Sequence, residues 1–408
     1  MESAVGRLPK KKTRQGIEYM TRQTYRMGEL FGGPGGMALG ARLAAQSVEG
    51  VELRHAWAND YDLDTCETYR RNILVPEYGD GAQVVECARD LPFGGGGVVH
   101  QNVHDLDIDS LSPIDGFAFG FPCNDYSLVG KWKGLRGDFG PLYSYGVKVL
   151  ASKKPKWFVA ENVSGLRGAN QGRAFKQILE HLQAPEGGPR YRLVPHLYSF
   201  NEYGVPQRRQ RIVIVGIRDD LQVDFRVPSP AIYKDIDVSA SAALLSPSIA
   251  TDAANHQIAK LSTQVVERLS YLRPGENAFS PRALQEMPKR LHINTRTTIS
   301  TTYKRLEADK PAYTVTGAGG GGSYVYHWTL DRALTNREKA RLQSFPDDFV
   351  FSGVSDSVRK QVGMAVPVKG AEAVFTALFK SFAGTSYPSI EPNIRVTDIL
   401  ARSTNKAA

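Results

Sequence analysis

Apolar runs separated by short polar or glycine-rich stretches recur through the first half of the chain. Runs of this length bounded by turn residues predict buried strands, and the stretches of helical period between them predict helices. The predicted strands cover 24–31, 54–60, 96–106, 114–121, 154–162, 191–200 and 211–218, and the predicted helices cover 37–46, 62–72 and 144–152. Because the strands alternate with helices and are apolar throughout, we expect an α/β fold with a mostly parallel sheet covered on both faces.

The pattern changes after about residue 225. Turn-rich stretches follow, without a strand–helix alternation, as far as the glycine cluster at 317–323, and helical character returns at 334–345 and 369–382. We therefore expect a separate, smaller domain or a large insertion after the α/β domain. The predicted organisation is a basic arm at 1–23, a large domain at 24–225, a smaller domain at 226–330, a segment at 331–385 that completes both, and a tail at 386–408.

Composition is that of an ordinary globular protein, with 41% hydrophobic and 23% charged residues. No apolar run approaches the roughly 18 residues needed to cross a bilayer. Cys66, Cys87 and Cys123 are too few and too scattered for a disulfide framework or a tetrahedral zinc site, which favours a reducing compartment.

The positive charge is unevenly distributed. The formal net charge is +9, and residues 1–27 supply seven Lys/Arg against two Glu. A second basic stretch, 287–306, lies between Glu286 and Glu307 and mixes its cations with Thr, Ser, Asn, His and Tyr. Such side chains bond phosphates or base edges, so the stretch indicates nucleic acid, although an exposed polar hairpin would have the same composition.

A glycine turn follows the first predicted strand, at 31–36, and precedes a helix. Gly33 and Gly35 let a ligand approach the backbone, and the helix N-terminus offers free N–H groups. Asp60 ends the next strand, where a carboxylate can hold both ribose hydroxyls, and Asp105 closes the third as a candidate for an adenine edge or a helix cap. No Lys-Ser/Thr follows the glycines, so we expect a nucleoside-bearing cofactor rather than a phosphate-gripping loop.

Cys123 follows a proline directly after the apolar run 114–121, where a strand gives way to a loop. Glu161 and Asn162 end the next strand, and carboxyl ends of parallel strands meet at one edge of the sheet. A thiol beside a glutamate suggests covalent catalysis. Arg209 and Arg211 alternate before an apolar strand, so we expect both on one face, one in the site and one as support.

In this order, the motifs resemble those of the DNA cytosine-5 methyltransferase family over roughly residues 26–385. They are FGGPGG (31–36), ND (59–60), GFPCNDYSLVG (120–130), ENV (161–163), QRRQR (207–211), REKARLQSFPDDF (337–349) and QVGMAVP (361–367). The resemblance implies a Rossmann-like methyltransferase domain at 24–225, a target-recognition domain at 226–330, and S-adenosyl-L-methionine as cofactor.

It also implies the chemistry. Cys123 would add to C6 of a cytosine flipped out of the duplex, so that C5 can take the methyl group. Glu161 would hold N3, Arg209 would bond the carbonyl oxygen, and Asn162 and Arg211 would support them. The implied cofactor residues are Phe31, Gly33, Gly35, Asp60, Asp105, Leu106, Pro122, Leu142, Met364 and Ala365.

The implied partner is double-stranded DNA. Expected DNA contacts are Lys131, Lys133 and Arg136 of a mobile loop at 127–140, and Lys289, Arg290, Arg296, Thr297, Lys304 and Arg305 of the recognition domain. Three residues depart from the family pattern: Asn124 replaces Gln, Asp60 replaces Glu, and Met364 replaces an Asn near the cofactor, which predicts a change in rate, cofactor fit or transferred group.

Three alternatives stay open at this point: the tRNA-methylating branch of the family, a DNA-binding relative without catalysis, and a nicotinamide enzyme on a similar sheet. The long region between 226 and 316 favours duplex DNA over tRNA. We further expect a cytoplasmic, nucleoid-associated bacterial monomer, with a cognate restriction endonuclease as a candidate partner acting separately. The sequence recognised in DNA does not follow from the residues.

Overall fold

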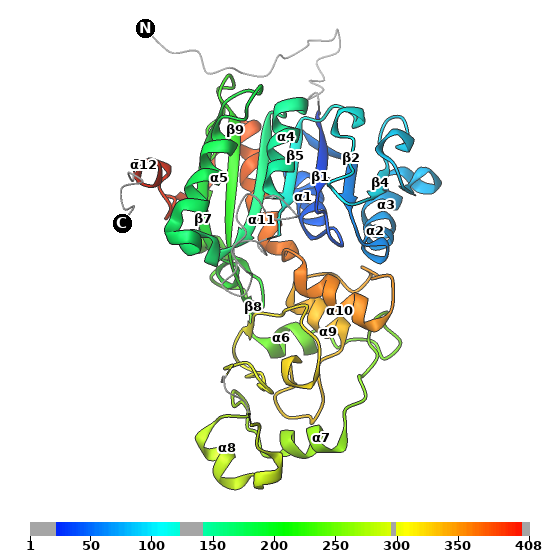
Figure 1. Cartoon of the computed structure of the whole chain (residues 1–408), viewed down its shortest axis with the longest axis vertical. Helices are drawn as coiled ribbons and strands as arrows, with labels where there is room; N and C mark the ends of the chain where they lie inside the picture. The colour runs from blue at the N-terminus through cyan, green and yellow to red at the C-terminus, as the bar shows by residue number, and fades with distance from the viewer. Residues whose placement is uncertain (1–21, 123–141, 295–298, 402–408) are drawn as a thin grey trace, which may run out of the picture.

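The computed structural model describes residues 22–122, 142–294 and 299–401. Its centre is an eight-stranded sheet (Figure 1). In spatial order the strands are β3 (Gln83–Val85), β4 (Gly97–His100), β2 (Val51–Asp60), β1 (Gln23–Leu30), β5 (Gly116–Gly120), β6 (Trp157–Val163), β9 (Gln210–Arg218) and β7 (Tyr191–Ser199). All pairs are parallel except those that β9 makes with β6 and β7. The expected α/β fold with a mostly parallel sheet is confirmed.

The antiparallel strand has a simple origin. A parallel pair needs a crossover of a dozen or more residues, usually a helix, whereas antiparallel neighbours accept a shorter link. Only residues 200–209 join β7 to β9, and they hold a single helical turn, Phe200–Tyr203, and the two-residue strand β8 (Gln207–Arg208). The chain therefore reverses, and β9 inserts between β6 and β7.

Alternate side chains of each strand enter different cores. In β5, Phe117 and Phe119 belong to one apolar cluster and Ala118 to the other. Helices α4 (Tyr143–Lys153) and α5 (Arg173–Gln183) pack on the first face, and α1 (Gly36–Ser47) and α11 (Val368–Phe382) pack on the second. Two-residue periodicity thus explains why the predicted strands are apolar throughout. Helix α5 and strand β3 had no counterpart among the predicted elements.

The last long helix packs on the first one. At Gly40 of α1, a Cβ atom would lie 2.6 Å from the Cβ of Ala371 in α11. The backbones of the two helices therefore approach more closely than two larger side chains would allow. Because α11 covers the same face as α1, a segment about 330 residues later in the chain completes the α/β domain.

A smaller region lies next to the carboxyl edge of the sheet, at the bottom of the view in Figure 1. Its helices are α6 (Ala240–Leu245), α7 (Thr263–Ser270), α8 (Pro281–Glu286), α9 (Asn336–Leu342) and α10 (Ser355–Met364). A two-residue parallel pair joins β11 (Ala312–Tyr313) to β8. Part of this region has a small apolar cluster of its own around Leu269, Leu291 and Tyr326, whereas other residues, such as Leu342 and Phe345, belong to the same core as α1 and α11. We refer to residues 226–364 as the recognition region, a name taken from the role that the family resemblance predicts for 226–330 and extended to α9 and α10, which fold with it.

The predicted tail is partly folded. Strand β12 (Ser389–Ile390) pairs with β10 (Val227–Pro228), and α12 (Val396–Leu400) packs against α5 and β7. Asn393 bonds both the N–H and the C=O of Leu197, at 2.8 and 3.0 Å, and Ile394 is 3% exposed. The segment therefore covers the free edge of β7, which the sequence pattern did not indicate.

One stretch of the described chain, Ser355–Phe382, is long and apolar enough by length and composition to cross a membrane, although no such run was expected. It comprises α10 and α11, which are separated at residues 365–367, and 72% of its apolar window is buried within the fold. These are the properties of helices that pack inside a globular core.

Candidate active site at the carboxyl edge of the sheet

The glycine turn lies between β1 and α1, as expected. Gly33 and Gly35 have φ of +56° and +97°, which L-residues with a side chain rarely adopt. A Cβ at Gly35 would lie 2.7 Å from Ile73, and one at Gly36 would collide with the carbonyl oxygen of Val366. The turn is therefore packed tightly from both sides, and it presents the N-terminus of a 12-residue helix.

Asp60 joins this turn to the end of β2. Its Oδ2 accepts the Gly33 N–H at 3.0 Å and its Oδ1 accepts the Asp62 N–H at 3.2 Å. Burial raises the pKa of the Asp60 carboxyl to about 6, against the opposing effect of these two N–H groups. Tyr61, which follows it, is 68% exposed. Sequence reasoning missed this tyrosine, although an aromatic residue directly after a strand-end acid was visible.

Glu29 is a second carboxyl that the sequence analysis did not single out. It lies in β1 with no exposed surface and accepts the Tyr69 hydroxyl at 3.0 Å. Burial raises the pKa of Glu29 to about 8, so its side chain is mostly protonated at neutral pH. Its side-chain carbons lie against Gly32, which makes Glu29 and Tyr69 the floor of the glycine turn.

Asp105 does not close a strand. Strand β4 ends at His100, where its pairing with β2 also ends, and Asp105 lies in the following turn with its N–H bonded to Asn102 O at 2.9 Å. Its side chain is exposed, whereas Leu106 is buried. The polar run after His100 therefore forms turns rather than the longer strand expected at 96–106.

The remaining expected cofactor residues surround the same edge. Pro122 is exposed two positions after β5, and Leu142 directly precedes α4. Met364 ends α10 and is 60% exposed, whereas Ala365 is buried beside Val366, whose carbonyl faces Gly36. Cys123, Lys131, Lys133, Arg136, Arg296 and Thr297 lie outside the described residues.

Glu161 and Arg211 form an ion pair where β6 and β9 run side by side. Arg211 Nε lies 2.8 Å from Glu161 Oε1, and both side chains are 13% exposed. Asn162 is buried and donates from Nδ2 to Phe121 O at 2.9 Å. This bond fixes the backbone immediately before Pro122, and with it the point from which the following loop departs.

Arg209 is placed differently from the expected contact with the base. It is 2% exposed, and its guanidinium donates to Val315 O at 2.8 Å and to Gly363 O at 3.1 Å. Burial, with the nearby Arg211 adding to it, lowers the pKa of Arg209 to about 9. The expectation is corrected: Arg211 reaches the glutamate, while Arg209 ties the link before β9 to two points of the recognition region.

A small cavity opens next to this ion pair. It has a volume of about 350 Å³, and its lining is polar: Ser164, Asn201, Arg208, Gln210, Arg211 and Thr314. These residues come from the ends of β6 and β7, from the link to β9 and from the recognition region. Arg211 therefore faces both Glu161 and a hydrophilic space large enough for part of a nucleotide.

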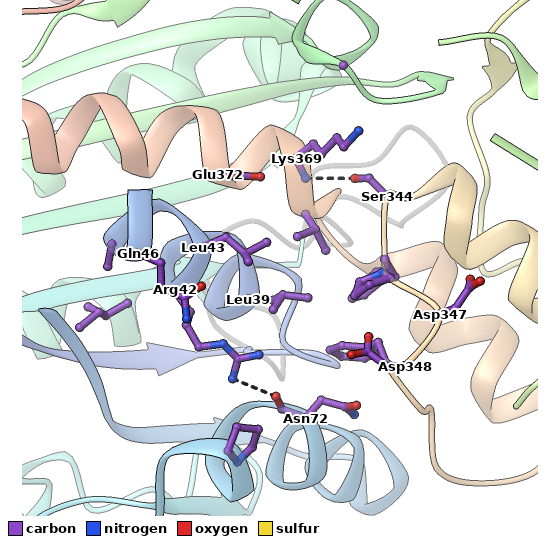
Figure 2. A pocket seen from close by; sticks show the side chains of 18 of the residues that line it. Leu39, Arg42, Leu43, Gln46, Asn72, Ser344, Asp347, Asp348, Lys369 and Glu372 are labelled. Carbon is purple, nitrogen blue, oxygen red and sulfur yellow. Dashed lines mark hydrogen bonds between the residues drawn. The ribbon is translucent and has the colours of Figure 1, made fainter. Parts of the chain in front are cut away.

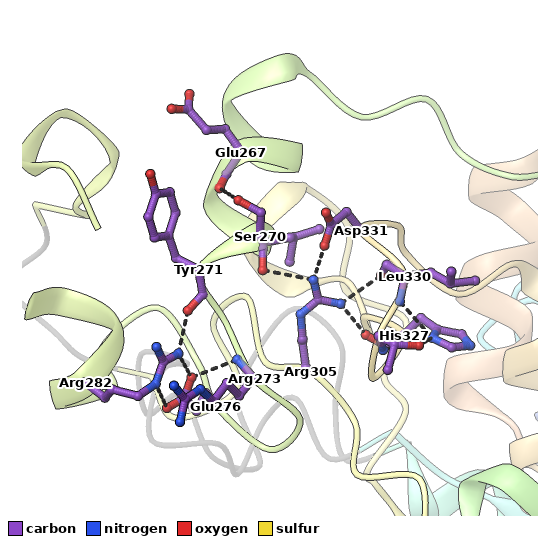
Figure 3. Close-up of polar contacts among 12 residues, drawn as sticks. Glu267, Ser270, Tyr271, Arg273, Glu276, Arg282, Arg305, His327, Leu330 and Asp331 are labelled. Carbon is purple, nitrogen blue, oxygen red and sulfur yellow. Dashed lines mark hydrogen bonds and ion pairs between the residues drawn. The ribbon is translucent and has the colours of Figure 1, made fainter. Parts of the chain in front are cut away.

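Arg305 is likewise not a surface contact. It is 2% exposed and donates to the carbonyl oxygens of His327, Leu330 and Leu269 at 2.7–2.9 Å, besides pairing with Asp331 (Figure 3). Its expected role in DNA binding is corrected, because its side chain is buried and both terminal nitrogens donate inside the recognition region.

Three other basic residues of this stretch that the structure describes are accessible. Lys289 and Arg290 are exposed, and Arg290 pairs with Glu267. Lys304 is half-buried, with Nζ 5.6 Å from the centre of the Tyr313 ring. Only these three of the six expected contacts in the recognition region are both described and available at its surface.

A larger cavity, of about 1680 Å³, lies elsewhere (Figure 2). It runs along α1 past Leu39, Arg42 and Gln46, and reaches the amino end of β2 and the loop at Ser344–Val350. None of the described catalytic or cofactor candidates lines it. No group of three or more potential metal ligands occurs among the described residues.

Comparison with known proteins identifies the family. Residues 25–380 match C-5 cytosine-specific DNA methylase. The chain is 51% identical over 375 residues to Type II methyltransferase M.BbvI of Brevibacillus brevis, covering 90% of this chain and 94% of the relative. It is 36% identical over 360 residues to Type II methyltransferase M.NgoFVII of Neisseria gonorrhoeae, covering 87% and 86%.

Solved structures share the fold at low identity. A putative DNA modification methyltransferase from an Escherichia coli prophage superposes with a TM-score of 0.61 at 20% identity, covering 88% of this chain and 99% of the other. Spodoptera frugiperda DNMT2 gives 0.56 at 15% identity, covering 87% and 99%. On the family match and the two relatives, the chain belongs to the C-5 cytosine-specific DNA methylase family and is an S-adenosyl-L-methionine-dependent DNA cytosine-5 methyltransferase.

Proposed function

We propose that Cys123, Glu161 and Arg211 carry out the methylation of cytosine in this enzyme. The observation that supports this assignment is the Glu161–Arg211 pair at 2.8 Å, at the sheet edge where Pro122, the residue before Cys123 in the sequence, also lies. Arg211 replaces Arg209 as the residue that donates to the carbonyl oxygen of the base. Arg209 has both terminal nitrogens bonded to backbone carbonyls and is buried.

In the proposed reaction, Cys123 adds to the cytosine ring and is expelled after the methyl group has been transferred. The Cys123 sulfur, after losing its proton to solvent, bonds to C6, and the C5=C6 electron pair makes C5 nucleophilic. The proton released from Cys123 returns through solvent to N3 by way of the Glu161 carboxylate, and Arg211 donates to the carbonyl oxygen, which together stabilise the negative charge that sulfur adds to the ring. Once C5 carries the methyl group, C5 gives its proton to solvent, the double bond re-forms and expels the thiolate, and N3 returns its proton through Glu161 to solvent.

We propose that the glycine turn and Asp60 hold the cofactor. The residues fit a nucleoside: a strand-end carboxylate, an exposed Tyr61 ring beside it, and a helix N-terminus behind the glycine turn, where Gly33 has open space on its Cβ side and Gly35 and Gly36 are closely packed. Bound S-adenosyl-L-methionine supplies an electrophilic methyl group. Phe31, Leu106, Pro122, Leu142, Met364 and Ala365 would shape the rest of the pocket, and the exposed Asp105 would approach the adenine edge from the turn after β4.

We propose that duplex DNA lies between the sheet edge and the recognition region. Lys131, Lys133, Arg136, Lys289, Arg290, Arg296, Thr297 and Lys304 remain the proposed DNA contacts, and Arg305 is withdrawn. Because the relatives at 51% and 36% identity are named Type II methyltransferases, we also propose that a cognate restriction endonuclease acts separately. We also propose that the protein is a cytoplasmic monomer associated with bacterial DNA.

The assignment is tested by trapping the covalent step. A duplex containing 5-fluorocytosine in the target site, incubated with enzyme and S-adenosyl-L-methionine, should leave a protein–DNA adduct that survives denaturation, because fluorine at C5 cannot leave as a proton does. Cys123→Ser should give no adduct while still binding cofactor by calorimetry. An adduct of undiminished yield with Cys123→Ser would refute the assignment of the nucleophile.

The cofactor site has its own test. Asp60→Asn keeps the size of the side chain and removes the charge that would hold the ribose hydroxyls. We expect its affinity for S-adenosyl-L-methionine to fall at least tenfold, while DNA binding without cofactor stays within twofold. Unchanged cofactor affinity would place the site elsewhere.

A further inference from the structure

Two asparagines hold neighbouring residues of one segment in the same way. We call residues 349–352, between α9 and α10, the strap. Asn72 accepts the Val350 N–H and donates to Val350 O, both at 2.9 Å. Asn255 accepts the Phe351 N–H and donates to Phe351 O, both at 3.0 Å. Each side chain therefore satisfies the two backbone groups of one residue, as a neighbouring strand would.

The two asparagines belong to different parts of the molecule. Asn255 lies in the recognition region itself, whereas Asn72 lies in the α/β domain, in a π-helical turn (Arg70–Leu74) that follows α2 (Leu63–Tyr69). Asn72 is 9% exposed, and its side chain also donates to Thr68 O at 2.7 Å. A π-helical turn holds one residue more than an α-helical turn, and such turns recur at functional sites. Here the turn directs the side-chain amide of Asn72 toward the recognition region.

The same turn contacts the glycine turn of the proposed cofactor site. Ile73, the next residue, packs against Gly35. Arg42 of α1 donates to Asn72 O at 3.0 Å and to Ile73 O at 3.3 Å, and Figure 2 shows the first of these bonds. The backbone that carries Asn72 is therefore held between the first helix and the glycine turn.

The strap is also bonded to other parts of the recognition region and to α2. Arg337, which has no exposed surface, donates to Phe349 O at 2.6 Å and to Ala254 O at 3.0 Å. At its other end, Ser352 N–H donates to the Thr68 hydroxyl of α2 at 2.8 Å, and Gln361 of α10 donates to Ser352 O at 2.9 Å. A shift of the π-helical turn would therefore be transmitted through the strap to both α9 and α10.

We propose that Asn72 is a positioning residue that links the glycine turn to the recognition region. Through this link, the binding of cofactor and the binding of DNA are thermodynamically coupled. The proposal rests on the cofactor site proposed above. Asn255 makes the same two kinds of bond to the strap but lies within the recognition region. It therefore does not connect the strap to the proposed cofactor site.

The experiment measures coupling rather than activity. The dissociation constant of the full-length enzyme for target duplex is determined with and without saturating S-adenosylhomocysteine, and their ratio is the coupling factor. We expect a factor of at least five for wild type. Asn72→Ala should reduce it to below two, whereas Asn255→Gly should leave it within a factor of two of wild type.

Asn255→Gly is the matched control. It also removes two backbone bonds from the strap, and glycine accepts the φ of +62° at this position without strain. Both variants should lower the melting temperature by similar amounts, so a loss of coupling only in Asn72→Ala cannot come from general destabilisation. Should Asn72→Ala not fold, Thr68→Val removes the neighbouring bond from α2 to Ser352 and should also reduce the factor.

Three results would overturn the proposal. These are a wild-type factor near one, an Asn72→Ala factor that stays within twofold of wild type, and an equal loss of coupling in Asn255→Gly. Calorimetry with S-adenosylhomocysteine separates this failure from failure of the cofactor site: binding that Asp60→Asn leaves intact refutes the site, whereas lost binding with unchanged coupling in Asn72→Ala refutes only the link.

Discussion

The α/β domain and the recognition region are stabilised in different ways. In the sheet, strand ladders satisfy the backbone and alternate apolar side chains fill two cores. The recognition region has short helices, a small apolar cluster of its own and side chains that extend one core of the sheet domain, and it also relies on buried arginines: Arg268, Arg305 and Arg337 all donate to backbone carbonyl oxygens. A guanidinium has five N–H donors and no acceptor, so it suits a region with many unpaired carbonyls.

This difference explains which sequence predictions failed. The family resemblance assigned Arg209 to the base, and the composition of the basic stretch 287–306 assigned Arg305 to DNA. Both are 2% exposed and serve as internal donors. Neither before β9 nor in the recognition region does the sequence indicate which arginine faces inward, because the carbonyl oxygens that it bonds lie far along the chain, as Val315 does from Arg209.

The largest effect should distinguish the two neighbouring arginines. Arg211→Ala should lower kcat by about 10²–10³-fold, the range for losing one donor to a developing negative charge, with little change in melting temperature. Arg209→Ala should instead lower the free energy of unfolding, by about 2 kcal/mol, because Val315 and Gly363 lose their donors. Single-turnover methylation and thermal unfolding of both variants decide between these roles. If Arg209→Ala stays stable and is the slower enzyme, the exchange proposed here is wrong.

The next effect concerns the recognition region alone. Arg305→Met should destabilise it by about 3 kcal/mol, since several buried acceptors lose their donor at once. Arg290→Met, at an exposed site in the same basic stretch, should leave the free energy of unfolding near that of wild type. Hydrogen exchange of backbone amides should show faster opening in the recognition region and unchanged protection in β1, β2 and β5. Equal stability of the two variants would contradict the buried role of Arg305.

Acid should weaken both regions through one histidine in each. Burial lowers the pKa of His196 and of His327 to about 4, and their Nδ1 atoms accept the N–H groups of Asn393 and Leu330. The unfolded chain binds these protons near pH 6.5 and the folded chain only near pH 4, so stability is present above about pH 6.5 and is lost as pH falls toward 4. The loss is at most about 3 kcal/mol for each histidine.

Substitution separates the two contributions. His327→Asn keeps an acceptor oxygen without a titrating group. The free energy of unfolding of the recognition region should therefore fall less between pH 6.5 and 4 in this variant, while that of the α/β domain should fall as in wild type. The curve is measured by chemical denaturation between pH 4 and 8. A variant with the same acid sensitivity as wild type throughout would show that His327 does not contribute.

The smallest effect tests the exposed cations. Lys289→Ala should weaken binding to all duplexes alike and reduce the slope of log affinity against log salt by about one. Lys234→Ala, an exposed lysine after β10, is the control and should leave the slope unchanged. An unchanged slope in Lys289→Ala would remove this residue from the DNA contacts.

Most of the sheet could be predicted from the sequence, because two-residue periodicity and glycine turns act locally. The strands at 24–31, 54–60 and 211–218 lie within a few residues of β1, β2 and β9, and Gly33 meets Asp60 as strand-end geometry suggested. The hydrogen bonds between Asn72 and Val350 could not be predicted, since they join positions 278 residues apart. Nor could the folded segment around Asn393, whose interactions depend on where the edge of β7 lies.

The packing of α11 on α1 also affects how the protein is made. The glycine turn lies at residues 31–36, yet the carbonyl of Val366 against Gly36 and the helix that follows it come about 330 residues later. A ribosome must therefore have synthesised and released the chain as far as α11 before the turn acquires all its neighbours. Nascent chains that stop short of α11 should bind no cofactor and should leave the host chromosome unmodified.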